Sequence, residues 1–425
     1  MEVTGSLVVA ADPTQRLRAA DLQRQTAHWL AAATTFLDAE EFATAEAWRS
    51  VESQTGLGLR RQLHEAVQDL LRLGRTAREL AGRAERDPAA LATAARAVQL
   101  FRRRFTQVET TLEFFGDAVN SRTSETLRIV LRRLDQLAVA SMAPVLTAAG
   151  IPVPPVLTYV DKGMGASILR AGIRLWNPGT VNPVAAVKVV RHNLYRPTSL
   201  FHETGHQVAH LTGWVPSLRT RLVRALADDV HLQRMWLPWA SEIAADVYAF
   251  LLTGYASVAA LYDVVGDDRT IMRWPPGDPH PVGWLRTRLG CAFCRAVFGA
   301  GPWDDLERAM MAAHPVDRAE PTTAGLLARS VERLPQLAHA CLSAPVPLLA
   351  GRPMAAVLDP RRVAPEALGE LERTAGPALW RSAYWRGAEG IRMIALGGLR
   401  EAEDPARSTE WIDRARTWMT TVAAA

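Results

Sequence analysis

Lysine is almost absent from this chain of 425 residues, in which Lys162 and Lys188 are the only two. The net charge of +5 therefore comes from arginine. A preference for arginine reflects codon usage as readily as function, so the charge gives little support for an acidic partner. The triplet 102–104, Arg-Arg-Arg, lies between Phe101 and Phe105 in a helical pattern, which favours a solvated helix face. We therefore expect no nucleic-acid partner.

Cysteine is also scarce, with three residues in the whole chain. Secreted proteins more often carry an even, disulfide-bonded set, so this number favours a reducing compartment. Cys291 and Cys294 form a CxxC pair, but no second pair accompanies it and its neighbours are apolar, which favours packing over metal binding or redox chemistry. The opening residues, 1–11, have neither the basic nor the long apolar segment of a signal peptide, and we expect a cytoplasmic protein.

Long apolar runs are missing as well. The longest uncharged apolar stretch runs from Val247 to Tyr262 and is interrupted by Thr253 and Gly254. It is shorter than the roughly 20 residues that cross a bilayer. We therefore expect no membrane span and interpret this stretch as part of a buried helix.

The composition predicts a mostly helical α+β protein with two or three subdomains. At 48% hydrophobic residues the chain can bury a full core. Residues 1–150 are rich in Ala, Leu, Arg and Glu, with apolar residues at spacings of three and four, and are predicted to form a helical bundle or coiled-coil-like region. Residues 151–320 are predicted to hold the functional core, and residues 321–425 a second, proline-punctuated helical region.

A small β-sheet is predicted at the start of the core. Residues 155–160, 166–176 and 185–190 have the apolar, β-branched composition of strands, and Gly163 and Gly165 suit the first turn. The third strand leads into a helix that begins after Pro197.

That helix contains the most informative motif, an HExxH formed by His202, Glu203 and His206. Because a helix turns every 3.6 residues, both histidines lie on one face and can reach one metal ion. Glu203 lies beside them, where it can accept a proton from a metal-bound water without binding the metal. Gly205 costs about 1 kcal/mol in a helix, which is understandable if another segment or a substrate approaches closely there. The motif would arise by chance in about one such sequence in a hundred, so its surroundings must support it.

Two residues compete as the third ligand. His210 lies about 12 Å along the axis from His202, too far for both to bind one ion at about 2.1 Å. Glu242 opens a helix in which Asp246 lies on the same face, so that the glutamate can bind the metal while the aspartate orients a ligating histidine. Alternatively, both carboxylates only stabilise the helix N-terminus. The apolar sequence that follows predicts a buried helix, in which both carboxylates need partners.

HExxH followed by a helix with ExxxD resembles the gluzincin metallopeptidases. Farther along, residues 280–286 form an HPxxxxR motif. It is similar to a motif of the membrane prenyl-protein and heat-shock proteases, whose transmembrane spans this chain lacks. The resemblance implies a zincin-like core with a small sheet above the HExxH helix.

The resemblance also implies roles for individual residues. Zn²⁺ would be held by His202, His206 and Glu242, with Glu203 as the general base. His280 becomes a candidate for stabilising the oxyanion and Arg286 for an ordering salt bridge, although the prolines beside His280 also suit an ordinary turn. Tyr248 and Tyr255 are the alternatives for the oxyanion.

The sequence thus predicts a soluble zinc-dependent metallopeptidase that hydrolyses a peptide or protein substrate. Two other functions stay open. Two histidines and one carboxylate also suit iron(II), so an oxygen-dependent enzyme that modifies peptides is possible on the same residues. A catalytically inactive helical interaction protein is the second alternative.

Overall fold

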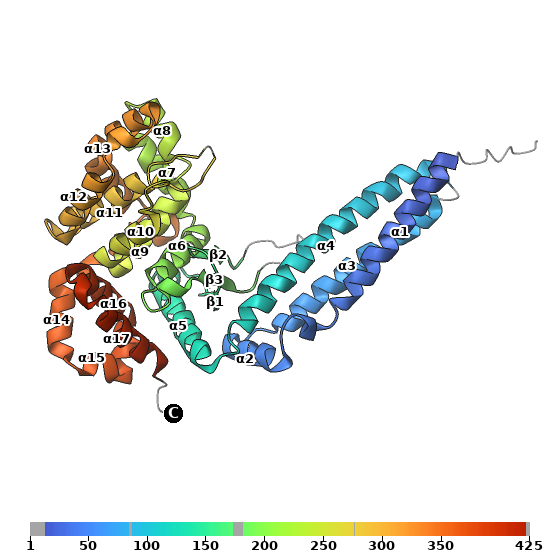
Figure 1. Cartoon of the computed structure of the whole chain (residues 1–425), viewed down its shortest axis with the longest axis horizontal. Coiled ribbons are helices and arrows are strands. Elements are labelled where there is room, and N and C mark those ends of the chain that lie inside the picture. Colours follow the sequence, from blue (N-terminus) through green and yellow to red (C-terminus); the bar gives the residue numbers. More distant parts are fainter. Residues whose placement is uncertain (1–12, 85–86, 173–181, 276, 422–425) are drawn as a thin grey trace, which may run out of the picture. The chain divides into compact units, whose positions relative to one another are not determined.

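The computed structural model describes residues 13–84, 87–172, 182–275 and 277–421 (Figure 1). Residues 1–11, on which the expectation about a signal peptide depends, lie outside the described residues. The chain forms two compact units, the first with α1 to α4 and the second with all later elements.

The first unit is built from long helices that pack along one another (Figure 1). Its helices are α1 (Pro13–Thr35), α2 (Ala45–Thr55), α3 (Leu59–Ala84) and α4 (Leu91–Asn120). The helices approach one another closely at Gly74 of α3, where an added Cβ would lie 2.7 Å from side-chain atoms of both Leu30 and Phe101. The absence of a side chain at this position lets α1, α3 and α4 share one core.

The second unit contains a three-stranded sheet of β1 (Val156–Val160), β2 (Ser167–Leu169) and β3 (Ala185–Val189). Its order is β1-β3-β2, with β3 parallel to β1 and antiparallel to β2. The small sheet is confirmed, although β2 is shorter than the predicted strand, whose last residues, 173–176, lie outside the described residues.

Helix α5 (Glu125–Ala148) belongs with this sheet, so the first unit ends before the predicted boundary at residue 150. A buried carboxylate explains the difference. Oδ1 of Asp135 on α5 accepts hydrogen bonds from the backbone N–H of Thr158 in β1 at 2.7 Å and from its hydroxyl at 2.8 Å. A helical period alone does not reveal which neighbour a helix packs against.

Helices make up the rest of the second unit, which confirms a mostly helical fold with a small sheet. Those around the sheet and the predicted motifs are α6 (Thr198–Thr212), α7 (Trp214–Ala225), α8 (Val230–Trp236), α9 (Ala240–Thr253), α10 (Tyr255–Val265), α11 (Gly283–Phe298) and α12 (Pro302–Ala313). The later ones are α13 (Pro321–Leu342), α14 (Pro365–Ala375), α15 (Ala378–Arg381), α16 (Ala383–Glu403) and α17 (Ser408–Thr420).

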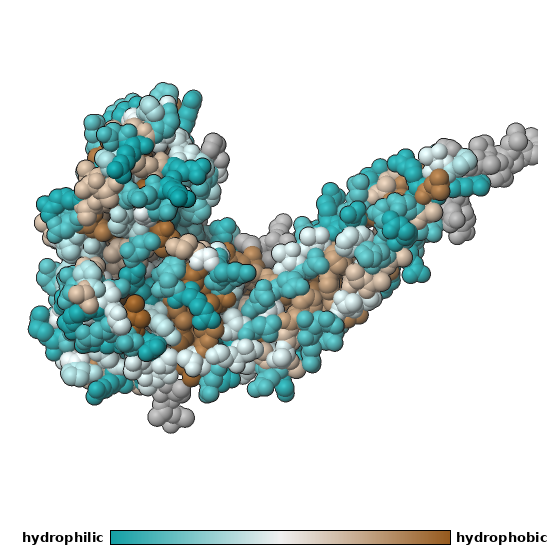
Figure 2. Space-filling view, in the orientation of Figure 1, coloured by the Kyte–Doolittle hydropathy of each residue, from teal (hydrophilic) through white to brown (hydrophobic). Residues whose placement is uncertain are grey.

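The helices after residue 321 do not form a unit of their own. Helix α13 packs on α7 and α11, and α16 packs on α10. Helices α9 and α10 are apolar nearly all round, so they need such cover on several sides. On the face shown in Figure 2, hydrophilic residues cover most of this unit and apolar residues appear in separate patches.

The long apolar run predicted as one helix is divided into α9 and α10 at Gly254, which has a φ of 57°. An added Cβ there would lie 2.9 Å from the carbonyl oxygen of Val363, so glycine is required both for the turn and for the space. Among the described helices, none combines the length with the apolar composition that a bilayer crossing requires.

The contact between α6 and α9 is very close, and Gly205 makes it possible. A Cβ at Gly205 would lie 2.9 Å from Cβ of Tyr248 and 3.0 Å from Cα of Ala245. The segment expected to approach this glycine is therefore α9. Because the two backbones are so near, side chains one turn away on each helix can meet.

We predict that Gly205→Ala lowers the free energy of unfolding by about 1 to 3 kcal/mol, because the added methyl overpacks this contact. Urea unfolding with a chelator present measures the change without a contribution from bound metal. Gly397→Ala in α16 is the matched control, since its Cβ would meet nothing within 4 Å. There alanine should stabilise by about 0.5 to 1 kcal/mol through helix propensity. Equal effects of both substitutions would contradict the close contact.

Candidate metal centre

Helix α6 presents both motif histidines on one face. The rings of His202 and His206 are 4.8 Å apart between centroids and nearly perpendicular, at 87°. Gln207, on another face, fixes the helix to the chain after β2: its Oε1 accepts from the backbone N–H of Ala171 at 2.8 Å, and its Nε2 donates to the Ala171 carbonyl at 3.2 Å. The helix ends at Thr212 and is followed by Gly213, whose φ is 65°.

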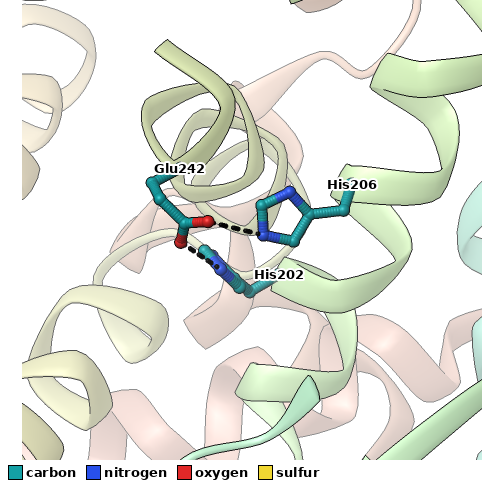
Figure 3. Close-up of side chains that lie close together, drawn as sticks. All are labelled: His202, His206 and Glu242. Atoms are coloured by element: carbon teal, nitrogen blue, oxygen red, sulfur yellow. Dashed lines mark ion pairs between the residues drawn. The ribbon is translucent and has the colours of Figure 1, made fainter. Parts of the chain in front are cut away.

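Glu242 of α9 lies between the two histidines (Figure 3). Its Oε2 is 3.3 Å from Nε2 of His202, and its Oε1 is 3.2 Å from Nε2 of His206. All three residues offer ligand atoms within 4.8 Å of one another. Neighbouring ligands of a tetrahedral ion with bonds of about 2.1 Å are about 3.4 Å apart, so the three side chains fit a single ion.

The surroundings of Glu242 also suit a cation. Only 7% of this residue is exposed, and three nitrogens surround its Oε2: Nε2 of His202 at 3.3 Å, and Nε2 of His280 and Nη2 of Arg286 at 3.6 Å each. A buried carboxylate is tolerated only where positive charge lies beside it. A metal ion held by the two histidines would provide positive charge at closer range.

Without a metal, a proton on His202 and the charge of Arg286 balance the negative charge of the carboxylates. Burial would lower the pKa of His202, but hydrogen bonds to Asp246 and Glu242 raise it to about 9. Burial would raise the pKa of Glu242, but the hydrogen bonds from His202 and His206 lower it. A metal ion would therefore take the place of a proton on His202.

Asp246 lies one turn after Glu242 and orients His202. Its Oδ1 is 2.9 Å from Nδ1 of His202. Arg286 of α11 holds Asp246 in turn, because its Nε donates to Oδ2 at 2.6 Å and its Nη2 to Oδ1 at 2.7 Å. The same Nη2 is 3.6 Å from Oε2 of Glu242. The predicted carboxylate and the predicted arginine thus form one largely buried chain of charges behind the ligands.

His280 reaches the site from the segment between α10 and α11. Its Nε2 lies 3.6 Å from Oε2 of Glu242, while 56% of its side chain is exposed. Asp278, which sequence reasoning missed, accepts hydrogen bonds from the backbone N–H of His280 at 2.9 Å and from its Nδ1 at 2.8 Å. The sequence signal was available, because the side chain of an aspartate often accepts a hydrogen bond from the backbone N–H two residues later. This pairing leaves Nε2 of His280 facing the centre.

Glu203 lies beside the ligands but outside the group that could hold the ion. It is 6% exposed and lines a cavity of about 510 Å³ that also reaches His202 and His280. Burial raises the pKa of Glu203. Such a carboxyl group is suited to exchanging a proton with a molecule in the cavity.

The structure places the other candidates away from the centre. His210 is exposed and does not belong to the ligand group. The hydroxyl of Tyr248 donates to the Ser141 carbonyl at 2.6 Å, and that of Tyr255 donates to the Pro302 carbonyl at 3.5 Å. Neither tyrosine lines the cavity. Neither hydroxyl therefore faces the cavity, because the helical phase of both residues directs the hydroxyls into other contacts.

The CxxC pair lies on α11, where Cys291 and Cys294 are free and buried, as is Cys341 on α13. Burial raises the pKa of all three thiols. Their surroundings agree with the predicted packing role, because reactive cysteines need partial exposure and a lowered pKa.

In comparisons with known proteins, neither a family model nor a curated protein nor a solved structure matches this chain.

We predict that the purified protein binds about one divalent transition-metal ion per chain, because three protein ligands make one site. His202→Ala, His206→Ala and Glu242→Ala should each lower the occupancy measured by elemental analysis. Asp246→Ala should keep the ligands yet weaken metal affinity by about 10- to 100-fold, the usual effect of losing a carboxylate that orients a histidine. Full occupancy in Glu242→Ala would assign the third ligand elsewhere.

Proposed function

We propose that this protein is a zinc-dependent peptidase with a zincin-like core. The observation that carries the proposal is the convergence of three separate segments. The HExxH of α6, the ExxxD of α9 and the HPxxxxR that leads into α11 share one site, although about 35 residues separate each from the next. A chance HExxH on a solvated helix has no reason to meet a glutamate at ligand distance.

Zinc bound by His202, His206 and Glu242 would polarise the substrate carbonyl and lower the pKa of a bound water towards 7. Glu203 takes the proton of the attacking water and passes it to the leaving amine. Its burial supports this role, since a raised pKa brings a carboxyl group nearer the operating pH. Asp246 fixes the ring of His202, and Arg286 fixes Asp246.

His280 is positioned to stabilise the negative charge that develops on the carbonyl oxygen. When Nδ1 of a neutral His280 ring donates to Asp278, the Nε2 that faces the site carries no proton. Nε2 can therefore donate to the carbonyl oxygen only from a protonated ring or from the other tautomer. A charged donor at this place favours the oxyanion over the neutral carbonyl.

The small sheet supports a peptide or protein as the substrate. β2 lies at an edge of the sheet, and Gly165 and Ala166, directly before it, line the cavity. An edge strand offers backbone groups to an extended peptide of any sequence. A cytoplasmic location and the absence of a nucleic-acid partner stay predictions.

The two alternatives differ from the proposal in measurable ways. An oxygen-dependent enzyme would contain iron and require oxygen with a cosubstrate. An inactive interaction protein would turn over no peptide. Elemental analysis and a peptide assay therefore separate all three functions.

We predict that Glu203→Gln keeps zinc and fold but loses hydrolysis, because an amide cannot accept the proton of the water. A diverse peptide library is incubated with wild type or variant under anaerobic conditions without 2-oxoglutarate, and products are identified by mass spectrometry. Cleavage by the wild type alone supports the proposal. Products heavier by one oxygen that appear only with iron, oxygen and cosubstrate would overturn it.

We predict that His280→Ala leaves zinc bound and lowers kcat by about 10²- to 10³-fold, the usual cost of one oxyanion contact. Asp278→Ala should have a smaller effect in the same direction, because it only releases the ring from its orientation. Steady-state kinetics on one cleaved peptide measure both. A change confined to KM would instead assign His280 to substrate binding.

A further inference from the structure

The cavity beside the metal centre changes from polar to apolar along α9. Glu242, Asp246, Ala249 and Phe250 all line it, at spacings of four, three and one residues that keep them on one side of the helix. Phe250 lies eight positions after Glu242, which corresponds to about 12 Å along the axis. The cavity therefore extends well beyond the ligands.

Helix α11 repeats this change of polarity. Arg286, Gly290 and Phe293 line the cavity at spacings of four and three. The rings of Phe250 and Phe293 lie 5.6 Å apart between centroids, so the apolar ends of both helices meet. Along these two helices, charged side chains therefore line the end of the cavity at the metal centre, and aromatic side chains line the other end.

Helix α10 forms another wall, which is mostly apolar. Val258, Ala260, Leu261 and Val264 line the cavity there, together with Ser257, whose hydroxyl donates to the Gly254 carbonyl at 2.9 Å. The wall is fixed at Gly290, where an added Cβ would lie 2.9 Å from Cγ1 of Val258. We call the part of the cavity lined by Ala249, Phe250, Val258, Ala260, Leu261, Val264 and Phe293 the apolar arm.

We propose that the apolar arm binds a large aliphatic or aromatic side chain of the substrate, at the residue next to the cleaved bond. The inference rests on the proposed function and names its specificity. The whole cavity, of about 510 Å³, has the size of pockets that enclose small ligands, so it can hold such a side chain together with the reacting carbonyl.

The chemistry of the arm selects against small and charged side chains. Burial of a Leu- or Phe-sized group is worth about 10- to 100-fold in binding, and a small side chain forgoes this gain. A charged side chain would lose its hydration without finding a partner on the walls of the arm. The rim, which carries Arg273, Asp278 and His280, tolerates polar groups and so contributes less to selection.

Cleavage of a peptide library by the wild type gives the first test. Leu, Phe, Met and Ile should be enriched at one position adjacent to the cleaved bond, and replacing that residue by Ala in a single peptide should lower kcat/KM by about 10- to 100-fold. Cleavage without preference for large apolar residues at either adjacent position would overturn the inference while leaving the proposed peptidase intact.

Neighbouring alanines of α10 provide matched variants. Ala260 lines the cavity, whereas Ala259 is partly buried and does not. Ala260→Leu should lower the preference for Leu over Ala peptides at least about tenfold with zinc content unchanged, and Ala259→Leu should retain the preference. Ala249→Leu fills the arm from α9, and its preference for Leu over Ala peptides is the second test if Ala260→Leu fails to fold. Equal changes in the lining and control variants would overturn the inference.

Binding of n-alkyl hydroxamates tests the arm without hydrolysis. In calorimetry with the zinc-loaded protein, affinity should rise about fourfold for each methylene that enters the arm, and this dependence should disappear in Ala260→Leu. If it holds while no peptide is cleaved, the arm is supported and the peptidase is not. Affinity independent of chain length would reject the arm alone.

Discussion

The contact between α6 and α9 is the constraint on which the centre depends. Gly205 allows α9 to approach so closely that a single added carbon would lie 2.9 Å from Cβ of Tyr248. One turn away, the same approach sets Glu242 at 3.2 to 3.3 Å from the two imidazoles. Interiors pack at nearly crystalline density and deform little, so the spacing of the two helices fixes the spacing of the ligands.

Charge compensation is the second requirement. Three carboxyl groups, from Glu203, Glu242 and Asp246, lie in or beside one site, and the largely buried Arg286 pairs with Asp246. Buried charges are tolerated only when they are paired, so without a metal a proton on His202 completes the balance, and a metal ion would take the place of that proton. The pairing also orients the side chains, because Arg286 holds the carboxylate of Asp246 and Asp246 holds the ring of His202.

The two helices that carry the charges also carry the apolar arm. Along α9 and α11, charged residues face the centre and phenylalanines follow about two turns later. A substrate of the proposed peptidase would thus be held at one end by groups that act on a carbonyl and at the other by a surface that only excludes water. The helices after residue 321 support this arrangement indirectly, because they cover the outer sides of α10 and α11.

Sequence by itself determined what one helix can arrange. The helical period placed His202 and His206 on one face of their helix, and Glu242 and Asp246 on one face of a second helix. The pattern of apolar residues predicted a mostly helical chain with a small sheet. Tertiary structure alone decided that α5 joins the sheet, that Tyr248 turns away from the centre, and that side chains from three helices enclose an apolar arm. Contacts between elements depend on which faces pack together, and a local period does not encode that choice.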